Sequence, residues 1–265
     1  MRTRDWTIGK YKELCEVATE SGREVMGVGE YLTITSPERK LVIRHDIDLS
    51  CKSAFPIAGL ESCYQFRTSY YFRKRTFDPK IVYEISSLGH EIGYHYEVLD
   101  RSKGNFDVAK DLFTEELNLF RKEADIKTVC AHLNPVTVFD NRDFWKEYRL
   151  EDFGLIGEAY LSMNSGKTMY FTDTDRTWEE TDYEFKDLML GEDKAKRPKV
   201  KTTDELLAFI KKYSGDVYLN IHPERWANNF IDYAKMRIRD ALSCQTKFVL
   251  KSSPNLRKLL SYVYN

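Results

Sequence analysis

The stretch LVIRHDID, residues 41–48, has the composition of a buried strand and ends in two carboxylates. Six further β-rich runs follow it, at 68–73, 89–95, 128–132, 153–158, 168–173 and 217–222. Helical patterns separate these runs, at 52–64, 78–88, 106–124, 141–148 and 203–213. Because strands that alternate with helices are parallel and joined by right-handed crossovers, seven of them predict an α/β fold, either a doubly wound sheet or a closed or nearly closed barrel.

Polar side chains at the ends of these strands favour the barrel. No Gly-rich phosphate-binding motif follows the first strand, so a nucleotide-binding sheet lacks its usual signature. Chemically capable residues instead end five of the strands: Asp46, His95, His132, Asp173 and His222. The carboxyl ends of parallel strands are where α/β barrels and open sheets place their sites.

The composition indicates a globular protein. The 265 residues are 42% hydrophobic, and the 41 basic and 42 acidic side chains nearly cancel. This balance argues against partnership with nucleic acid or a membrane surface. No apolar run is long enough to span a membrane, and the N-terminus has no signal-peptide pattern, so we expect a cytoplasmic protein.

We predict one domain over residues 1–265. Residues 1–38 form a lead-in, with an amphipathic helix that ends near Gly22 and then a short extended or turn-rich stretch. Residues 174–202 are polar and carry a run of charges, so we expect a lid or a solvated insertion there.

Two aspartates end the first strand. Alternation along a strand places Asp46 and Asp48 on one face and His45 on the other. Neighbouring carboxylates repel unless a cation or a shared proton relieves them, and a divalent metal would leave the second carboxylate free as a base. The alternative is structural: Asp48 caps the next helix and Asp46 pairs with an arginine.

A second motif, GHEIGYHYE at residues 89–97, places His95 and Glu97 two apart at a strand end, where both can face a metal. His90 begins the strand at the far end, and we expect it to be a core residue.

These two motifs, about 45 residues apart, resemble the polysaccharide deacetylase superfamily of the NodB-homology, carbohydrate esterase family 4 type. Later motifs around His132, Asp173 and His222 resemble a subgroup associated with surface-polysaccharide synthesis, and the resemblance covers roughly residues 40–230. It implies a distorted (β/α)7 barrel. It also implies that Asp46 is the catalytic base and that Asp48 and His95 are metal ligands.

One position departs from that family. The second histidine ligand is expected four residues after His95, where this chain has Leu99. We expect His132 to replace it, because zinc favours nitrogen ligands and the subgroup keeps a histidine there, with Glu97 as the second candidate. The structural alternative for His132 is a hydrogen bond to a backbone carbonyl.

The resemblance implies an activity: hydrolysis of an N-acetyl or O-acetyl group on a sugar, assisted by one divalent metal, zinc, in polysaccharide or O-antigen-type biosynthesis. His222 is the expected general acid, Asp173 could orient His222 or Arg176, and Asp173, Arg176 and Trp226 are the expected substrate contacts. The expected substrate is an acetylated sugar, as a nucleotide-activated or lipid-linked precursor.

Two alternatives stay open. One is a catalytically impaired deacetylase-like domain that binds a saccharide precursor or a pathway partner, which Leu99 would favour. The other is a metal-dependent hydrolase of a non-sugar amide.

Overall fold

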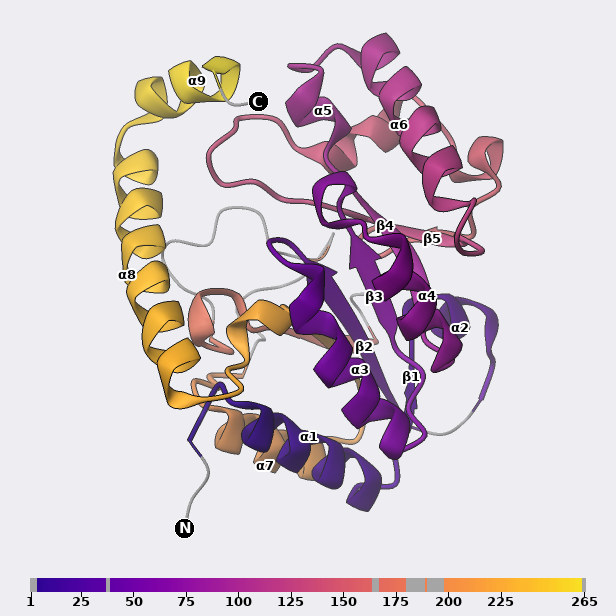
Figure 1. Ribbon diagram of the computed structural model, residues 1–265, viewed down its shortest axis with the longest axis vertical. Coiled ribbons are helices and arrows are strands. Elements are labelled where there is room, and N and C mark those ends of the chain that lie inside the picture. The colour runs from indigo at the N-terminus through magenta and orange to yellow at the C-terminus, as the bar shows by residue number, and fades with distance from the viewer. Residues whose placement is uncertain (1–3, 37–38, 164–166, 180–188, 190–197, 264–265) are drawn as a thin grey trace.

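Eight parallel strands form the centre of the computed structural model, which describes residues 4–36, 39–163, 167–179, 189 and 198–263 (Figure 1). Seven strands lie side by side in the order β6-β5-β4-β3-β2-β8-β7, and β1 pairs with the first residues of β2. The bounds are β1 Glu24–Met26, β2 Lys40–Ile47, β3 Ser69–Phe72, β4 Glu91–Tyr96, β5 Thr128–Ala131, β6 Gly157–Glu158, β7 Thr168–Thr172 and β8 Asp216–Ile221.

The sheet curls into a half-barrel. Among the described residues no ladder joins its two end strands, β6 and β7, so the barrel is open there. Side chains fill the inside of the curl instead. The Arg44 guanidinium of β2 donates to the Tyr218 hydroxyl at 2.9 Å and to the Ala159 carbonyl at 3.3 Å, and it lies 3.9 Å from the centre of the Tyr160 ring. The curl is therefore a packed interior.

Helices surround the sheet, with α3 and α4 on its outer face and α8 and α9 along one side of the molecule (Figure 1). They are α1 Ile8–Glu20, α2 Val28–Thr33, α3 Ala54–Cys63, α4 Pro79–Ser87, α5 Val98–Arg101, α6 Phe106–Phe120, α7 Thr203–Lys212, α8 Phe230–Ser252 and α9 Pro254–Val263, with 3-10 turns η1 Cys51–Ser53, η2 Lys74–Thr76, η3 Asn141–Lys146, η4 Leu150–Phe153, η5 Thr174–Arg176 and η7 Pro223–Arg225. Local sequence explains their ends: in α4, Asp78 accepts a hydrogen bond from the Lys80 backbone N–H and Pro79 occupies the first turn.

Six of the seven predicted strands are confirmed within a residue or two, and one is mostly wrong. The run 153–158 contributes only the two residues of β6, because η4 occupies Leu150–Phe153 and Gly154 then adopts a left-handed backbone at φ 65°. The helix expected at 141–148 is the 3-10 turn η3. Short polar segments at the open edge of the sheet thus depart most from the expected pattern.

The N-terminal residues, which were expected to form a lead-in to the barrel, are part of the hydrophobic core. Tyr11, Leu14 and Cys15 of α1 are fully buried against the outer face of β2 and β8. The stretch after α1 supplies β1, which pairs with β2 beside the point where β3 begins, and the short helix α2.

Residues 230–263, for which the sequence pattern predicts no element, form α8 and α9. Helix α8 runs along one side of the molecule and α9 continues from its end (Figure 1). The expected lid at 174–202 lies mainly outside the described residues, since only 174–179, 189 and 198–202 of it are described.

Candidate active site

A cavity of about 350 Å³ lies at the carboxyl ends of the strands. Its lining includes five of the residues expected at the site: Asp46, Asp48, His95, His132 and His222. The end of the chain contributes as well, because Arg239, Asp240, Ser243 and Lys247 of α8 line the same cavity. The structure therefore brings Asp46 and His222, 176 residues apart in the chain, to one pocket.

Asp48 is the centre of this group. Its Oδ1 atom lies 3.3 Å from Nε2 of His95 and 3.6 Å from Nε2 of His132, and its Oδ2 atom lies 3.7 Å from Nε2 of His222. Oδ1 is buried and has no aligned hydrogen bond. Three imidazoles thus converge on one carboxylate in directions that hydrogen bonding does not satisfy.

The strands place these side chains. Asp46 is the inward-facing residue near the end of β2, and His45 points the other way, to Glu61 at 3.0 Å, as strand alternation predicts. His95 of β4 pairs with Cys130 of β5, and the His132 backbone N–H continues that ladder by donating to the Tyr96 carbonyl at 2.8 Å. Adjacent strand ends therefore deliver the two imidazoles together.

His95 has a defined tautomer. Its Nδ1 lies 2.9 Å from the Cys130 carbonyl oxygen, which can only accept, so Nδ1 carries the proton. In the neutral ring, Nε2 then presents its lone pair toward Asp48. This is the arrangement that metal-ligating histidines use.

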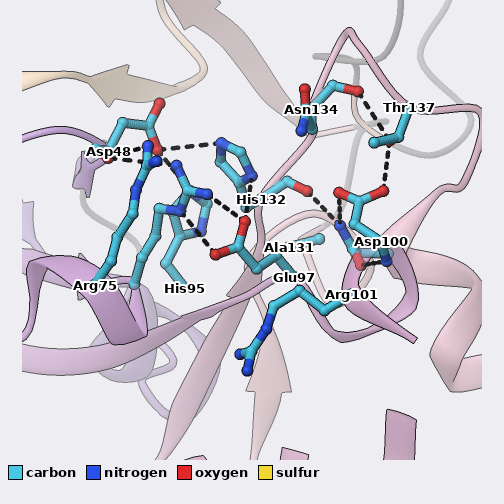
Figure 2. A network of polar contacts seen from close by, with 12 residues as sticks. Asp48, Arg75, His95, Glu97, Asp100, Arg101, Ala131, His132, Asn134 and Thr137 are labelled. Carbon is cyan, nitrogen blue, oxygen red and sulfur yellow. Dashed lines mark hydrogen bonds and ion pairs between the residues drawn. The ribbon is translucent and has the colours of Figure 1, made fainter. Parts of the chain in front are cut away.

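Glu97 supports His132 from behind (Figure 2). Arg73 donates to both carboxylate oxygens of Glu97, and Nδ1 of His132 lies 3.4 Å from one of them. Burial would raise the pKa of Glu97, but His132 and Arg73 lower it to about 2. Since the Glu97 carboxylate is bound by Arg73 and also contacts Nδ1 of His132, it is the poorer candidate for a third ligand.

Leu99 provides no ligand. It is buried at the start of α5, where its backbone N–H donates to the Asn141 side chain at 2.9 Å. The same Asn141 donates to the His132 carbonyl at 2.7 Å. The segment after β4 thus fixes the backbone of His132.

His222 is held by Asp173. The distance from His222 Nδ1 to Asp173 Oδ1 is 2.6 Å, and Trp226 donates its indole N–H to Asp173 Oδ2 at 2.9 Å. Burial would lower the pKa of His222, but the charge of Asp173 and its hydrogen bond raise it to about 9. Two partners were expected for Asp173, namely His222 and Arg176. These contacts show that Asp173 orients His222.

The structure does not place Arg176 and Trp226 as substrate contacts. Trp226 is 1% exposed and packs edge-on against Trp6 and Tyr11 in the core. Arg176 is buried and its Nε donates to Asp240 of α8. Both lie outside the cavity lining, because their side chains are used to hold Asp173 and α8 in place.

The electrostatics of the pocket centre on Asp48. Burial would raise its pKa, but the neighbouring His132, His95 and His222 hold it well below the ordinary value. Glu224 shows the opposite effect, since burial and the charge of Asp48 raise its pKa to about 7. The pocket thus holds one firmly ionised carboxylate and one that titrates near neutrality.

A group of residues here could hold a metal ion. Asp46, His95 and Cys130 each offer one ligand atom, and these atoms lie within 4.8 Å of one another. Asp48 and the Nε2 atoms of His95 and His132 offer an overlapping set. The two separations from Asp48 Oδ1, 3.3 and 3.6 Å, are close to the ~3.4 Å edge of a tetrahedron with ~2.1 Å bonds, and Oδ1 is buried without a hydrogen bond, but this set is less compact than the Asp46, His95 and Cys130 group.

Three features of the pocket were missed from the sequence. Cys130 points to Asp46, with its Sγ 3.6 Å from Oδ1, and strand alternation with His132 could have indicated this inward position. Glu224 is buried with Oε2 lacking a hydrogen bond and follows His222 by two residues. The wall from α8 had a signal in Asn229, whose side chain caps the helix.

Comparison with known proteins finds no family model, curated protein or solved structure that matches this chain. Within the described residues, no helix combines the length and apolarity needed to cross a bilayer. The site therefore has to be interpreted from its own geometry.

Proposed function

We propose that the chain is a metal-dependent deacetylase of the polysaccharide deacetylase type, with its half-barrel a distorted (β/α)7 barrel, that removes an acetyl group from a sugar. The observation that carries the proposal is the convergence of His95, His132 and His222 on the half-buried Asp48 carboxylate, whose Oδ1 is buried without a hydrogen bond. It supports the roles that the sequence resemblance implies for these positions.

The metal ligands in this proposal are Asp48, His95 and His132, and the metal is zinc. The competing set uses Asp46 and Cys130 with His95. Asp46 Oδ2, however, lies 3.4 Å from the fully buried Arg44 guanidinium, and a permanent cation beside the site opposes a divalent ion. At Asp48, the donors Arg73 and Arg75 hydrogen-bond to the backbone carbonyl, and Oδ1 of the side chain has no hydrogen bond. Its carboxylate is thus the one left for a metal.

A divalent ion bound there would lower the pKa of a bound water and polarise the acetyl carbonyl. Asp46 lines the same cavity and is the proposed base that takes the proton from water. Arg44 lies 3.4 Å from Oδ2 of Asp46, and Cys130 Sγ lies 3.6 and 3.9 Å from its Oδ1 and Oδ2, so the carboxylate is oriented before substrate arrives.

His222 is the proposed general acid. Nδ1 of His222 is hydrogen-bonded to Asp173, so Nε2 is the nitrogen that faces the cavity. With a pKa of about 9 the ring carries a proton at neutral pH, and it can deliver that proton to the leaving nitrogen or oxygen of the sugar.

The test combines metal content and acetate release. Protein purified without chelator or added metal is analysed for bound metal and assayed with N-acetyl and O-acetyl sugars, including an acetamido-sugar nucleotide. We expect bound zinc in the wild type, together with acetate release. Both are lost in Asp48→Asn and kept in Asp125→Asn, a matched change at an exposed carboxylate.

The outcomes separate the alternatives. Bound metal with hydrolysis of simple amides but not of acetylated sugars would support the non-sugar amidase. Absence of both metal and acetate release in the wild type would refute the enzyme and leave the saccharide-binding domain.

A further inference from the structure

Helix α8 has two very different faces. One faces the cavity: Lys247 donates to Asp175 at 2.6 Å, Asp240 accepts from Arg176, and Leu250 is buried. The other carries large exposed aliphatic side chains. Ten of the 16 large hydrophobic residues exposed in the described part of the chain lie on α8 and α9.

The exposed aliphatic residues of α8 form one stripe. Ile231, Ile238, Leu242 and Val249 are 64%, 65%, 61% and 49% exposed. Their spacings of 7, 4 and 7 residues place them within an arc of about 40°. Phe230 and Phe248, also exposed, and two alanines widen this face to about 120°, an arc that also holds Gln245 and Ser252. An apolar face of this width on a surface helix would normally be covered.

The charge of this region differs from that of the rest of the chain. Residues 230–265 carry seven Lys and Arg against two Asp, whereas residues 1–229 carry 34 basic and 40 acidic side chains. The balanced total therefore hides a basic C-terminal region. Lys235 and Arg237 are exposed beside the apolar stripe.

We propose that the outer face of α8, together with α9, docks on the surface of a phospholipid bilayer that carries anionic headgroups. A wide apolar face with flanking cations is what an interfacial helix needs, because the apolar residues enter the headgroup boundary and the cations pair with anionic lipid. The proposal does not depend on the deacetylase activity, since none of the stripe residues lines the cavity.

A second copy of the chain fits this face less well. If two α8 helices paired as a coiled coil, the seam through Ile231, Ile238, Leu242 and Val249 would also include Lys235 and Gln245. Polar residues at two seam positions weaken such a pair, while Lys235 at the edge of the apolar face suits a bilayer. Docking would place the cavity about 10 Å, one helix diameter, from the membrane surface.

The test is co-sedimentation of the full chain with vesicles. We expect binding to phosphatidylcholine vesicles that contain phosphatidylglycerol, and much weaker binding to phosphatidylcholine alone. Ile238→Ser with Leu242→Ser should lower partitioning at least about tenfold. Lys235→Gln with Arg237→Gln should lower it about thirtyfold on anionic vesicles only. Tyr83→Ser, which removes an equally exposed ring from α4, should bind like the wild type.

Sedimentation velocity of the same proteins without lipid completes the test. Absence of binding to anionic vesicles, or binding that the α8 substitutions leave unchanged, would overturn the proposal. So would a wild-type dimer that Ile238→Ser with Leu242→Ser converts to a monomer without any vesicle binding, because a second copy would then cover this face. Acetate release plays no part in these readouts, so either proposal can fail alone.

Discussion

Two buried clusters in this protein pair a carboxylate with histidines, and they differ in what is left unsatisfied. Around Glu61, Oε1 accepts from Tyr11 at 2.5 Å and lies 3.0 Å from His45 Nε2, while Oε2 accepts from Thr68 and Tyr70 at 2.7 and 2.6 Å. Both carboxylate oxygens of Glu61 thus have donors, although Nδ1 of His45 is buried without a hydrogen bond, and the cluster lies on the outer face of β2 and β3.

Around Asp48, by contrast, not every carboxylate oxygen has a hydrogen-bond donor. Oδ1 faces two imidazoles without an aligned hydrogen bond, and Glu224 nearby also keeps an oxygen without a partner. These atoms line a cavity. Because buried polar groups are normally satisfied, the difference between the two carboxylates supports a structural role for Glu61 and the proposed ligand-binding role for Asp48. Residue type alone would not separate them.

The largest expected effect is the loss of turnover in Asp46→Asn. If Asp46 is the base of the Asp48 cluster, turnover falls about 10²- to 10⁴-fold while metal content is unchanged. Acetate release and metal analysis on one preparation check this. Loss of metal in Asp46→Asn and also in Cys130→Ser would instead assign the ion to the Asp46, His95 and Cys130 set.

Glu61→Gln tests the cluster around Glu61. Removing a charge that four donors surround should lower the free energy of unfolding by about 3 kcal/mol, measured by urea denaturation, without changing metal content. Glu123→Gln, at an exposed position after α6, serves as the control. A variant that unfolds like the wild type would show that the cluster adds nothing to stability.

The same cluster predicts an acid response. Burial would raise the pKa of Glu61, but His45, His90 and Tyr11 lower it from 4.5 to about 2 in the folded protein. A depressed folded pKa contributes stability above pH 4.5 that is lost as the pH falls toward 2. The unfolding free energy of Glu61→Gln should therefore fall less steeply over that window than that of the wild type.

His132→Ala tests whether the Asp48 cluster binds zinc through His132. With the third ligand gone, zinc affinity should fall about a hundredfold or more, since even outer contacts of a zinc site cost up to about that much. The urea midpoint of the metal-free protein should change little. Unchanged zinc affinity would mean that another group, such as Glu97, completes the site.

The smallest expected effect is a fall in kcat in Trp226→Phe. The ring is kept, but Asp173 loses one of the donors that fix it behind His222. We expect about a tenfold fall in kcat, the cost of one hydrogen bond to a charged group, with the alkaline limb of the pH profile shifted. Trp178→Phe in the same aromatic core should leave the profile as it is, because its indole donates to Thr203.

The sequence predicts the parts of the molecule that repeat a strong pattern. Strands β2, β3, β4, β5, β7 and β8 follow their apolar runs, and the alternation of His45 with Asp46 is confirmed. The curl, the open edge and the strand order depend on contacts between distant segments. A local pattern carries no information on whether β6 meets β7.

Some residues of the candidate site could likewise be predicted from the sequence, and others could not. Asp46, Asp48, His95, His132 and His222 could be placed at one edge because parallel strands end there. Trp226 could not be assigned to the core from the sequence, because an aromatic residue beside polar ones has the same composition whether it faces a pocket or Trp6. Cys130 and Glu224 were missed because each looks like an ordinary buried residue or a solvated charge until its neighbours are known.

Helix α8 also bears on how the protein is made. It follows every strand that contributes to the cavity, and it supplies one wall of that cavity. At about 5–20 residues per second, a ribosome adds residues 223–252 over roughly 1.5–6 seconds after His222. During that interval the nascent chain already contains all three imidazoles but lacks the wall. The wall from α8 is therefore the last part of the cavity lining to be synthesised.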